Sequence, residues 1–119
     1  MTDSPRERLA AVRRDAIERL ASLEAQLDDI AEARRGANSD DEHDPEGSTL
    51  AFDRAQAAVL AADSRHVIEE VDAAVGRLDA GTYGVCERCG RPIGAARLEL
   101  RPTARLCVTC QAQAERRSG

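Results

Sequence analysis

Apolar residues recur at steps of three or four along the first third of the chain. They are Leu9, Val12, Ala16, Leu20, Leu23, Leu27 and Ile30. This spacing places side chains on one face of an α-helix. Ser4 and Pro5 fit the start of a helix, with serine as cap and proline at the first helical position, and Glu7 completes a capping box. No glycine or proline then follows until Gly36, so the sequence predicts a helix from residue 5 to about residue 35.

A second helical pattern occupies the middle of the chain. Its apolar and small residues are Leu60, Ser64, Val67, Val71, Ala74 and Leu78. Their alternating steps of four and three are the heptad repeat of a coiled coil. We expect this helix to begin near Ser48 or Thr49. It should end near Asp79, because Gly81 follows as a stop signal. Between the two helices, residues 36–48 contain two glycines, one proline and five carboxylates, which predicts a turn.

Two amphipathic helices of nearly equal length, joined by a short turn, most simply form an antiparallel coiled-coil hairpin. We therefore expect a mainly α fold, with this hairpin in residues 1–80 and an acidic tip at residues 36–48. The alternative is a bundle of three or four shorter helices, which would need helix breakers that these segments lack. Phe52 is expected to pack across the hairpin tip. Tyr83 is expected to pack where the hairpin meets the segment that follows.

The composition of the chain favours long exposed helices over a wide core. Of the 119 residues, 2% are aromatic and 33% are charged. The net charge is −5, and residues 36–81 hold 11 acidic side chains against 3 basic ones. Such a balance disfavours non-specific binding to nucleic acid or to an acidic membrane. No apolar run approaches the roughly 20 residues of a membrane span, and the first residues lack the apolar segment of a secretion signal, so we expect a cytoplasmic location.

Four cysteines provide the most specific chemical signal. Cys86, Cys89, Cys107 and Cys110 form the pattern C-x₂-C-x₁₇-C-x₂-C. This spacing is typical of structural zinc sites, because two residues between cysteines let one turn aim both sulfurs at one ion. Four thiolates leave no open coordination position, so we expect one structural Zn²⁺. Redox-active C-x-x-C motifs and simple disulfides are the alternatives.

Residues 81–119 are expected to form a small lobe that depends on this metal. So short a segment cannot fold on a hydrophobic core alone, which couples its folding to zinc binding. Within the lobe, we expect residues 98–100 to form a short strand. Residues 111–117 should form a C-terminal helix.

The sequence around the cysteines resembles the zinc finger of the DksA/TraR family. The resemblance rests on the stretches GTYGVCERCGRPI (81–93), RLE (97–99), RPTA (101–104) and CVTCQ (107–111). The predicted hairpin agrees with the family's architecture. Membership implies a non-enzymatic regulator that binds bacterial RNA polymerase directly and recognises no DNA sequence. It also implies that the zinc lobe docks near the rim of the polymerase's secondary channel while the coiled coil enters that channel.

The resemblance also assigns roles to individual residues. The family's tip motif is Asp-x-x-Asp-x-Ala, and its nearest match here places Asp41, Asp44 and Glu46 at the fixed positions. Asp41 and Asp44 are thereby expected to act near the polymerase active centre and to alter promoter open complexes. Glu46 stands where the family has alanine. Arg97 and Arg101 are candidate residues of a docking face on the finger.

Some family members act together with guanosine tetraphosphate. They bind it through basic residues on the second coil helix, on the finger and just after the last cysteine. Arg97 and Arg101 match the finger positions, but Gln111 follows the last cysteine and Glu70 occupies the coil position. Losing two cations weakens a site for a highly charged anion, so we expect a weak or absent response to this nucleotide.

Two other classes of function fit parts of the sequence. A DNA-binding zinc finger would need a strong basic stripe, which the lobe lacks once the thiolate charges are counted. A coiled-coil adaptor for some other protein would use the zinc only to stabilise its fold. An enzyme is not expected, because no pocket, nucleophile or base accompanies the acidic cluster.

Overall fold

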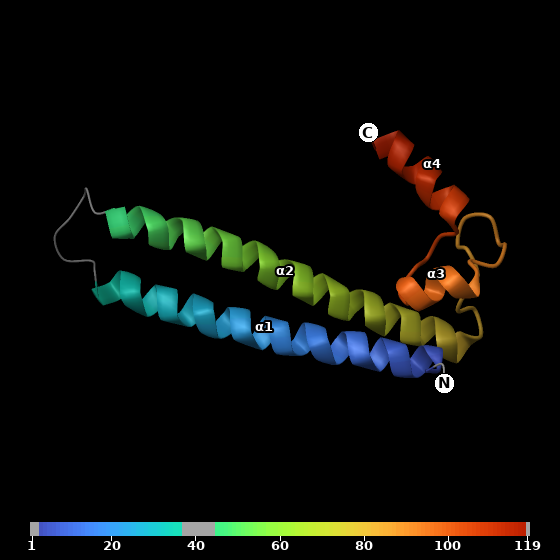
Figure 1. Ribbon diagram of the computed structural model, residues 1–119, viewed down its shortest axis with the longest axis horizontal. Coiled ribbons are helices and arrows are strands. Elements are labelled where there is room, and N and C mark those ends of the chain that lie inside the picture. The colour runs from blue at the N-terminus through green and yellow to red at the C-terminus, as the bar shows by residue number, and fades with distance from the viewer. Residues whose placement is uncertain (1–2, 37–44, 119) are drawn as a thin grey trace. The chain divides into compact units, whose positions relative to one another are not determined.

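A computed structural model describes residues 3–36 and 45–118, without the side chains of residues 45–48 and 118. Its elements are α1 (Pro5–Gly36), α2 (Pro45–Ala80), α3 (Ala95–Leu100) and α4 (Val108–Ser118) (Figure 1). The described part of the chain contains no β-strand, only an isolated bridge between Val85 and Pro92. The mainly α fold predicted from the sequence is confirmed.

Helix α1 begins and ends where the sequence predicts. The backbone N–H of Glu7 donates to Ser4 Oγ at 3.1 Å, and the N–H of Ser4 donates to Glu7 Oε1 at 3.0 Å. These two bonds complete the capping box and lower the pKa of the Glu7 carboxyl. The helix contains 32 residues, which at 1.5 Å per residue gives a length of about 48 Å.

Helix α2 begins at Pro45, three residues before the predicted start. Proline is well suited to the first helical position, because its missing N–H has no partner there and its φ angle is already helical. At the other end, Gly81 has a φ of 78°. Its N–H donates to Leu78 O at 3.2 Å, and that of Thr82 donates to Arg77 O at 2.9 Å. This is a Schellman motif, so the predicted stop at Gly81 is confirmed.

The chain divides into two compact units, Arg14–Ile68 and Met1–Arg13 with Glu69–Gly119. In the unit Arg14–Ile68, α1 and α2 pack against each other through a narrow core. The buried side chains of this core are Ala16, Leu23, Ile30, Ala57, Ala61 and Ser64. An ion pair of 3.2 Å between Glu24 and Arg65 also joins the two helices.

In the other unit, the first turns of α1 lie against the last turns of α2. Leu9, Val71 and Ala74 are buried there. Arg6 pairs with Asp79 at 2.7 Å, and Arg13 pairs with Asp72 at 2.9 Å. Because the partner number falls along α2 as it rises along α1, the helices are antiparallel, as the hairpin prediction requires. The predicted domain boundary after residue 80 stays a prediction.

The seam of α2 differs from its predicted course at one end. Leu60 is 44% exposed and Phe52 is 69% exposed, so the predicted packing of both residues is wrong. Ala57 and Ala61 are buried instead, in a cluster with Leu23 that Leu20 and Leu27 of α1 pack against. Large side chains from α1 already fill this space, so only small residues of α2 fit opposite them.

The predicted strand at residues 98–100 is also wrong, because these residues belong to α3. The segment Ala95–Leu100 consists of alanine, leucine, arginine and glutamate, all of which favour helices. Gly94, with a φ of 105°, precedes the helix, and its carbonyl accepts the N–H of Leu98 at 3.1 Å. The predicted C-terminal helix is present as α4, which begins three residues earlier than expected.

Candidate metal centre

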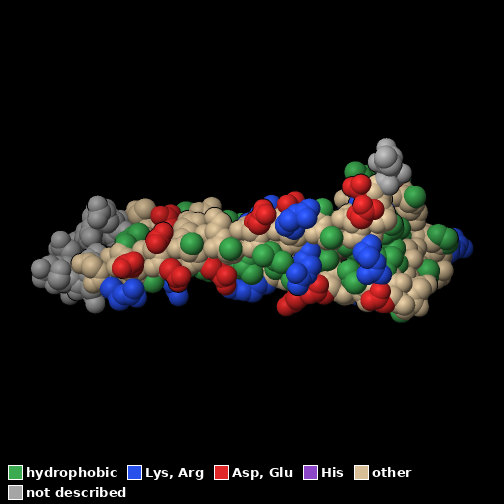
Figure 2. All heavy atoms as spheres, turned by 90° about the horizontal axis from the view of Figure 1, so that it is seen from below, with side chains coloured by type: hydrophobic (Ala, Val, Ile, Leu, Met, Phe, Trp, Pro, Cys, Tyr) green, Lys and Arg blue, Asp and Glu red, His purple; other side chains and the backbone are tan. Residues whose placement is uncertain are grey.

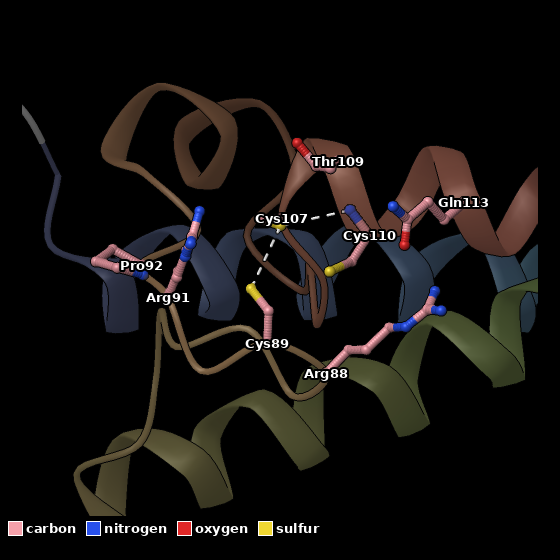
Figure 3. A pocket seen from close by; sticks show the side chains of 8 residues that line it. All are labelled: Arg88, Cys89, Arg91, Pro92, Cys107, Thr109, Cys110 and Gln113. Atoms are coloured by element: carbon pink, nitrogen blue, oxygen red, sulfur yellow. Dashed lines mark hydrogen bonds between the residues drawn. The ribbon is translucent and has the colours of Figure 1, made fainter.

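The four cysteines lie together in the folded lobe. Their Sγ atoms are all within 4.8 Å of one another, and all four are free thiols. Cys86 and Cys110 are buried, Cys107 is half-buried, and Cys89 is exposed. The sulfurs of Cys89 and Cys107 are 3.9 Å apart (Figure 3). The two C-x₂-C pairs, separated by 17 residues, therefore form one cluster.

A tight backbone turn presents the first pair. The N–H of Gly90 donates to Cys86 O at 3.0 Å, and the N–H of Cys86 donates to Arg91 O at 2.8 Å. Gly90 has a φ of 75°, which glycine adopts at little cost. The N–H of Ile93 closes the outer loop by donating to Gly84 O at 2.8 Å. These bonds fix both sulfurs on the same side of the turn.

The first turn of α4 presents the second pair. The backbone N–H of Cys110 points at Cys107 Sγ at 3.5 Å, and the N–H of Gln111 donates to Cys107 O at 2.9 Å. A helix N-terminus favours negative charge, so this position suits a thiolate. Ile93, Ala104, Leu98 and Leu106 surround the cysteines and form the small core of the lobe.

Hydrogen bonds lower the pKa of two of the cysteine thiols, whereas burial raises the pKa of a third. Backbone N–H groups of Cys89 and Cys107 lower the pKa of Cys86 to about 6. The N–H of Cys110 lowers the pKa of Cys107. Burial raises the pKa of Cys110 to about 12, with further contributions from the neighbouring cysteines. A cation among these sulfurs would favour the thiolate form of all four.

The donor set fits zinc. Zn²⁺ prefers four sulfur or nitrogen ligands in a tetrahedron, and four converging thiols satisfy that number without any other residue. With every position filled, such an ion takes no part in chemistry and acts by joining the two turns. In the described part of the chain, this is the one cluster of three or more potential ligands.

Arg105 connects the cysteine turn to α2. Its guanidinium donates to both carboxylate oxygens of Glu70, at 3.0 and 3.4 Å, and to Glu87 Oε1 at 3.0 Å. The N–H of Glu87, directly after Cys86, donates to Arg105 O at 2.9 Å. The carboxylates raise the pKa of Arg105. The sequence does not predict this contact, because Glu70 lies 35 positions before Arg105 and no local pattern joins the two residues.

Further bonds hold the loop between α3 and α4 against the end of α2. Tyr83 is half-buried, and its hydroxyl donates to Pro102 O at 2.7 Å. Burial raises the pKa of Tyr83. Arg77 donates to Thr103 O at 3.4 Å. Tyr83 thus packs where α2 meets the lobe, as predicted.

The predicted docking residues lie at α3. Arg97 is half-buried, and its Nε donates to Leu106 O at 3.0 Å. Arg101 follows the helix and is exposed. Their docking role stays a prediction. Of the predicted tip residues, Asp41 and Asp44 lie outside the described residues, and Glu46 lies in the first turn of α2 with its side chain outside the described part.

Known proteins share both the lobe and the helices. Residues 81–116 match the family described as prokaryotic dksA/traR C4-type zinc finger. The solved structure of transcription factor DksA2 from Pseudomonas aeruginosa superposes with a TM-score of 0.57 and 26% identity, covering 92% of this chain and 84% of that one. The finger of residues 81–116 therefore belongs to the prokaryotic dksA/traR C4-type zinc-finger family. The family's C4 finger and the four clustered thiols together identify one structural zinc site.

Individual curated relatives match this chain over parts of their own length. The protein of Caulobacter vibrioides named RNA polymerase-binding transcription factor DksA is 51% identical over 53 residues, which are 44% of this chain and 37% of that protein. General stress protein 16O of Bacillus subtilis is 36% identical over 92 residues, 77% of this chain and 55% of that protein. The chain therefore spans about a third to a half of these relatives. None of the described helices is both long and apolar enough to cross a membrane.

Proposed function

We propose that this protein binds bacterial RNA polymerase and modulates transcription initiation without catalysing a reaction. The observation that carries the proposal is the C4 finger of residues 81–116, together with relatives that are named as polymerase-binding transcription factors. The antiparallel pairing of α1 and α2 supports the same function. A cytoplasmic location follows from it, because the polymerase works there.

In this proposal the zinc ion is the structural anchor of the finger. Cys86, Cys89, Cys107 and Cys110 are its four ligands. When bound, zinc joins the turn before α3 to the start of α4, and Arg105 fastens that turn to α2 through Glu70 and Glu87. The finger then offers Arg97 and Arg101 to the rim of the polymerase channel.

The effector in this proposal is the connection between α1 and α2. Asp41, Asp44 and Glu46 enter the secondary channel and bring negative charge close to the metal-bearing active centre. Helices of 32 and 36 residues are long enough to span such a channel, since each rises by about 50 Å. The protein recognises no DNA sequence and binds no membrane.

A weak response to guanosine tetraphosphate belongs to the same proposal. The carboxylate of Glu70 stands where responsive relatives have a cation, and it is already paired with Arg105 at 3.0 Å. Gln111 contributes no positive charge. A nucleotide with several phosphates would meet a neutralised surface there.

The direct test is transcription in vitro with the polymerase of the same organism, with and without the zinc-loaded protein. We expect initiation at sensitive promoters to change, and the protein to co-purify with polymerase subunits. Capture of a different dominant protein would favour the adaptor. Salt-sensitive binding to bare duplex DNA would favour a DNA-binding finger. Either result, without an effect on transcription, contradicts the proposal.

A further inference from the structure

A four-residue turn follows α3 and begins at Arg101, one of the two proposed docking residues. The N–H of Ala104 donates to Arg101 O at 3.0 Å, which closes the turn, and the N–H of Arg101 donates back to Arg97 O at 2.7 Å. Pro102 occupies the second position of the turn, where its fixed φ angle is favoured. Ala104 is buried in the core of the lobe, whereas Arg101 is exposed. The turn therefore joins the core of the lobe to an exposed arginine.

Two side chains, one from the last turn of α2 and one from the residues after it, hold the middle of this turn. The hydroxyl of Tyr83 donates to Pro102 O at 2.7 Å, and the guanidinium of Arg77 donates to Thr103 O at 3.4 Å. The Tyr83 bond has the usual length for a hydroxyl donor, whereas the Arg77 bond is long. Of the two side chains, Tyr83 therefore restrains the turn more. All four residues lie in one compact unit of the chain.

Tyr83 remains a hydrogen-bond donor at neutral pH. Its side chain is half-buried, and burial raises the pKa of Tyr83 by more than the positive charges of Arg8 and Arg77 lower it. The phenol therefore keeps its proton, and a protonated phenol can donate to a backbone carbonyl, which accepts only.

Gly84, the next residue, lies against α3 itself. A Cβ added at Gly84 would lie 3.3 Å from Leu98 Cδ1, so the Leu98 side chain packs closely on the backbone there. Leu98 also packs against the buried cysteine cluster of the lobe. Arg101 stands in the sequence between Leu98 and Pro102. Residues 83 and 84 thus contact the chain before and after Arg101, which restrains the Arg101 backbone from both directions.

We propose that Tyr83 is a positioning residue for polymerase binding, because its hydroxyl fixes the turn that orients Arg101. The inference rests on the proposed function, which assigns polymerase docking to Arg101. A turn that is flexible in the free protein must be ordered when the polymerase binds, and this ordering costs binding free energy. The bond from Tyr83 to Pro102 O orders the turn beforehand. Tyr83 itself contacts no part of the polymerase in this proposal.

The test is a double-mutant cycle on the polymerase affinity of zinc-loaded proteins. Tyr83→Phe removes the hydroxyl and keeps the ring, so the packing of the lobe is preserved. It is measured alone and together with Arg101→Gln, which removes the proposed docking charge. Thr109→Val is the matched control, because it removes an exposed hydroxyl from α4 in the same lobe. Zinc content and circular dichroism establish that every variant keeps a folded finger.

We expect Tyr83→Phe to weaken polymerase binding about fivefold, which corresponds to the loss of one ordinary hydrogen bond, and Thr109→Val to bind like the original protein. In the Arg101→Gln background, Tyr83→Phe should have no further effect, because the residue that it positions is absent. A role of the hydroxyl in general stability would weaken binding equally in both backgrounds, and that result would overturn the inference.

The remaining outcomes separate this inference from the proposed function. If Tyr83→Phe binds like the original protein, or if Thr109→Val loses as much affinity as Tyr83→Phe, the inference is wrong and the proposed function stands. If Arg101→Gln alone leaves the affinity unchanged, Arg101 does not dock, and the inference is wrong although polymerase binding stands. If the original protein does not bind polymerase, both are wrong.

Discussion

The side chain of Arg105 joins its own loop to α2 and to the cysteine turn. It contacts Glu70 of α2 with two bonds and Glu87 of the cysteine turn with a third. Bidentate guanidinium–carboxylate pairs are among the stronger ion pairs, but the Arg105 side chain is 38% exposed, and water weakens the attraction. Its main effect is to fix the orientation of the turn relative to the end of α2.

Replacing Arg105 with glutamine should therefore lower the stability of the zinc-loaded protein modestly. We expect the free energy of unfolding to fall by about 1 kcal/mol, because a half-exposed pair contributes no more than that. Chemical denaturation followed by circular dichroism measures the change. Arg116→Gln, at an exposed position without an ion pair among the described residues, is the control and should change stability little. Equal stability of the two variants would remove the structural role assigned to Arg105.

Ser64 occupies an unfavourable position in the α2 seam. Its side chain is 2% exposed, and its hydroxyl has no hydrogen-bond partner among the described residues. A buried unpaired hydroxyl costs free energy, and serine also favours helices less than alanine does. Ser64 is buried on α2 together with Ala57 and Ala61. Its small size, and not its hydroxyl group, lets the two helices pack closely.

Ser64→Ala should raise the free energy of unfolding by about 1 kcal/mol. The matched control is Ser22→Ala on the exposed face of α1, which gains only the difference in helix propensity. Denaturation midpoints of both variants, compared with the original protein, separate the two contributions. A gain at Ser64 no greater than that at Ser22 would show that the buried hydroxyl is satisfied in solution.

At the scale of elements, the sequence predicts a helix well where several local signals agree. The extent of α1 was predictable because its cap, its apolar period and its uninterrupted interior all agree. The seam of α2 was not fully predictable, because hydrophobicity favoured Leu60 while the neighbouring helix left room only for Ala57 and Ala61. The six-residue helix α3 is too short for periodicity to distinguish it from a strand.

The four cysteines of the zinc site could be predicted from the sequence. The contacts that hold the cysteine turn against α2 could not. Each ligand pair is local in sequence, so spacing alone aims both sulfurs at one ion. The contact between Arg105 and Glu70 joins residues 35 positions apart, and no local pattern marks such a pair.

Loss of the metal should unfold the finger and spare the paired helices of residues 14–68. That unit has its own buried core and contains no cysteine. We expect Cys86→Ser to lose zinc, as measured by metal analysis, and to lose most of the hydrogen-exchange protection in residues 81–118. Protection in residues 14–36 and 49–68 should persist and serves as the internal control. Retention of one zinc per chain would contradict the ligand assignment.

At the scale of the whole molecule, charge is distributed unevenly along the chain. Residues 36–81 hold 11 acidic and 3 basic side chains, whereas residues 82–119 hold 3 and 7. On the face that Figure 2 shows, acidic and basic side chains are interspersed. On the helices, several arginines are neutralised by carboxylates across the hairpin, including Arg6, Arg13 and Arg65. Residues 40–46 contain five carboxylates and no arginine, so like charges are concentrated in this part of the sequence.

The proposed function assigns polymerase binding to the finger and the effect on initiation to the connection between α1 and α2, and substitutions can test this division. Asp41→Asn with Asp44→Asn removes two charges from the connection between α1 and α2 and leaves the finger unchanged. If the finger provides the contact, as proposed, we expect polymerase affinity to stay the same and the effect on initiation to disappear. Affinity measurements and transcription in vitro on the same preparations report the two properties independently.

The control for this experiment is Asp28→Asn with Asp29→Asn, which removes the same charge from exposed positions on α1. This control should keep both polymerase affinity and the effect on initiation. That result would show that the position of the two carboxylates matters and not the net charge of the protein. Loss of affinity in the Asp41 and Asp44 variant would make the connection an anchor instead of an effector. A full effect on transcription in that variant would place the active group elsewhere, because two amides cannot supply the charge that the two carboxylates bring to a metal-bearing centre.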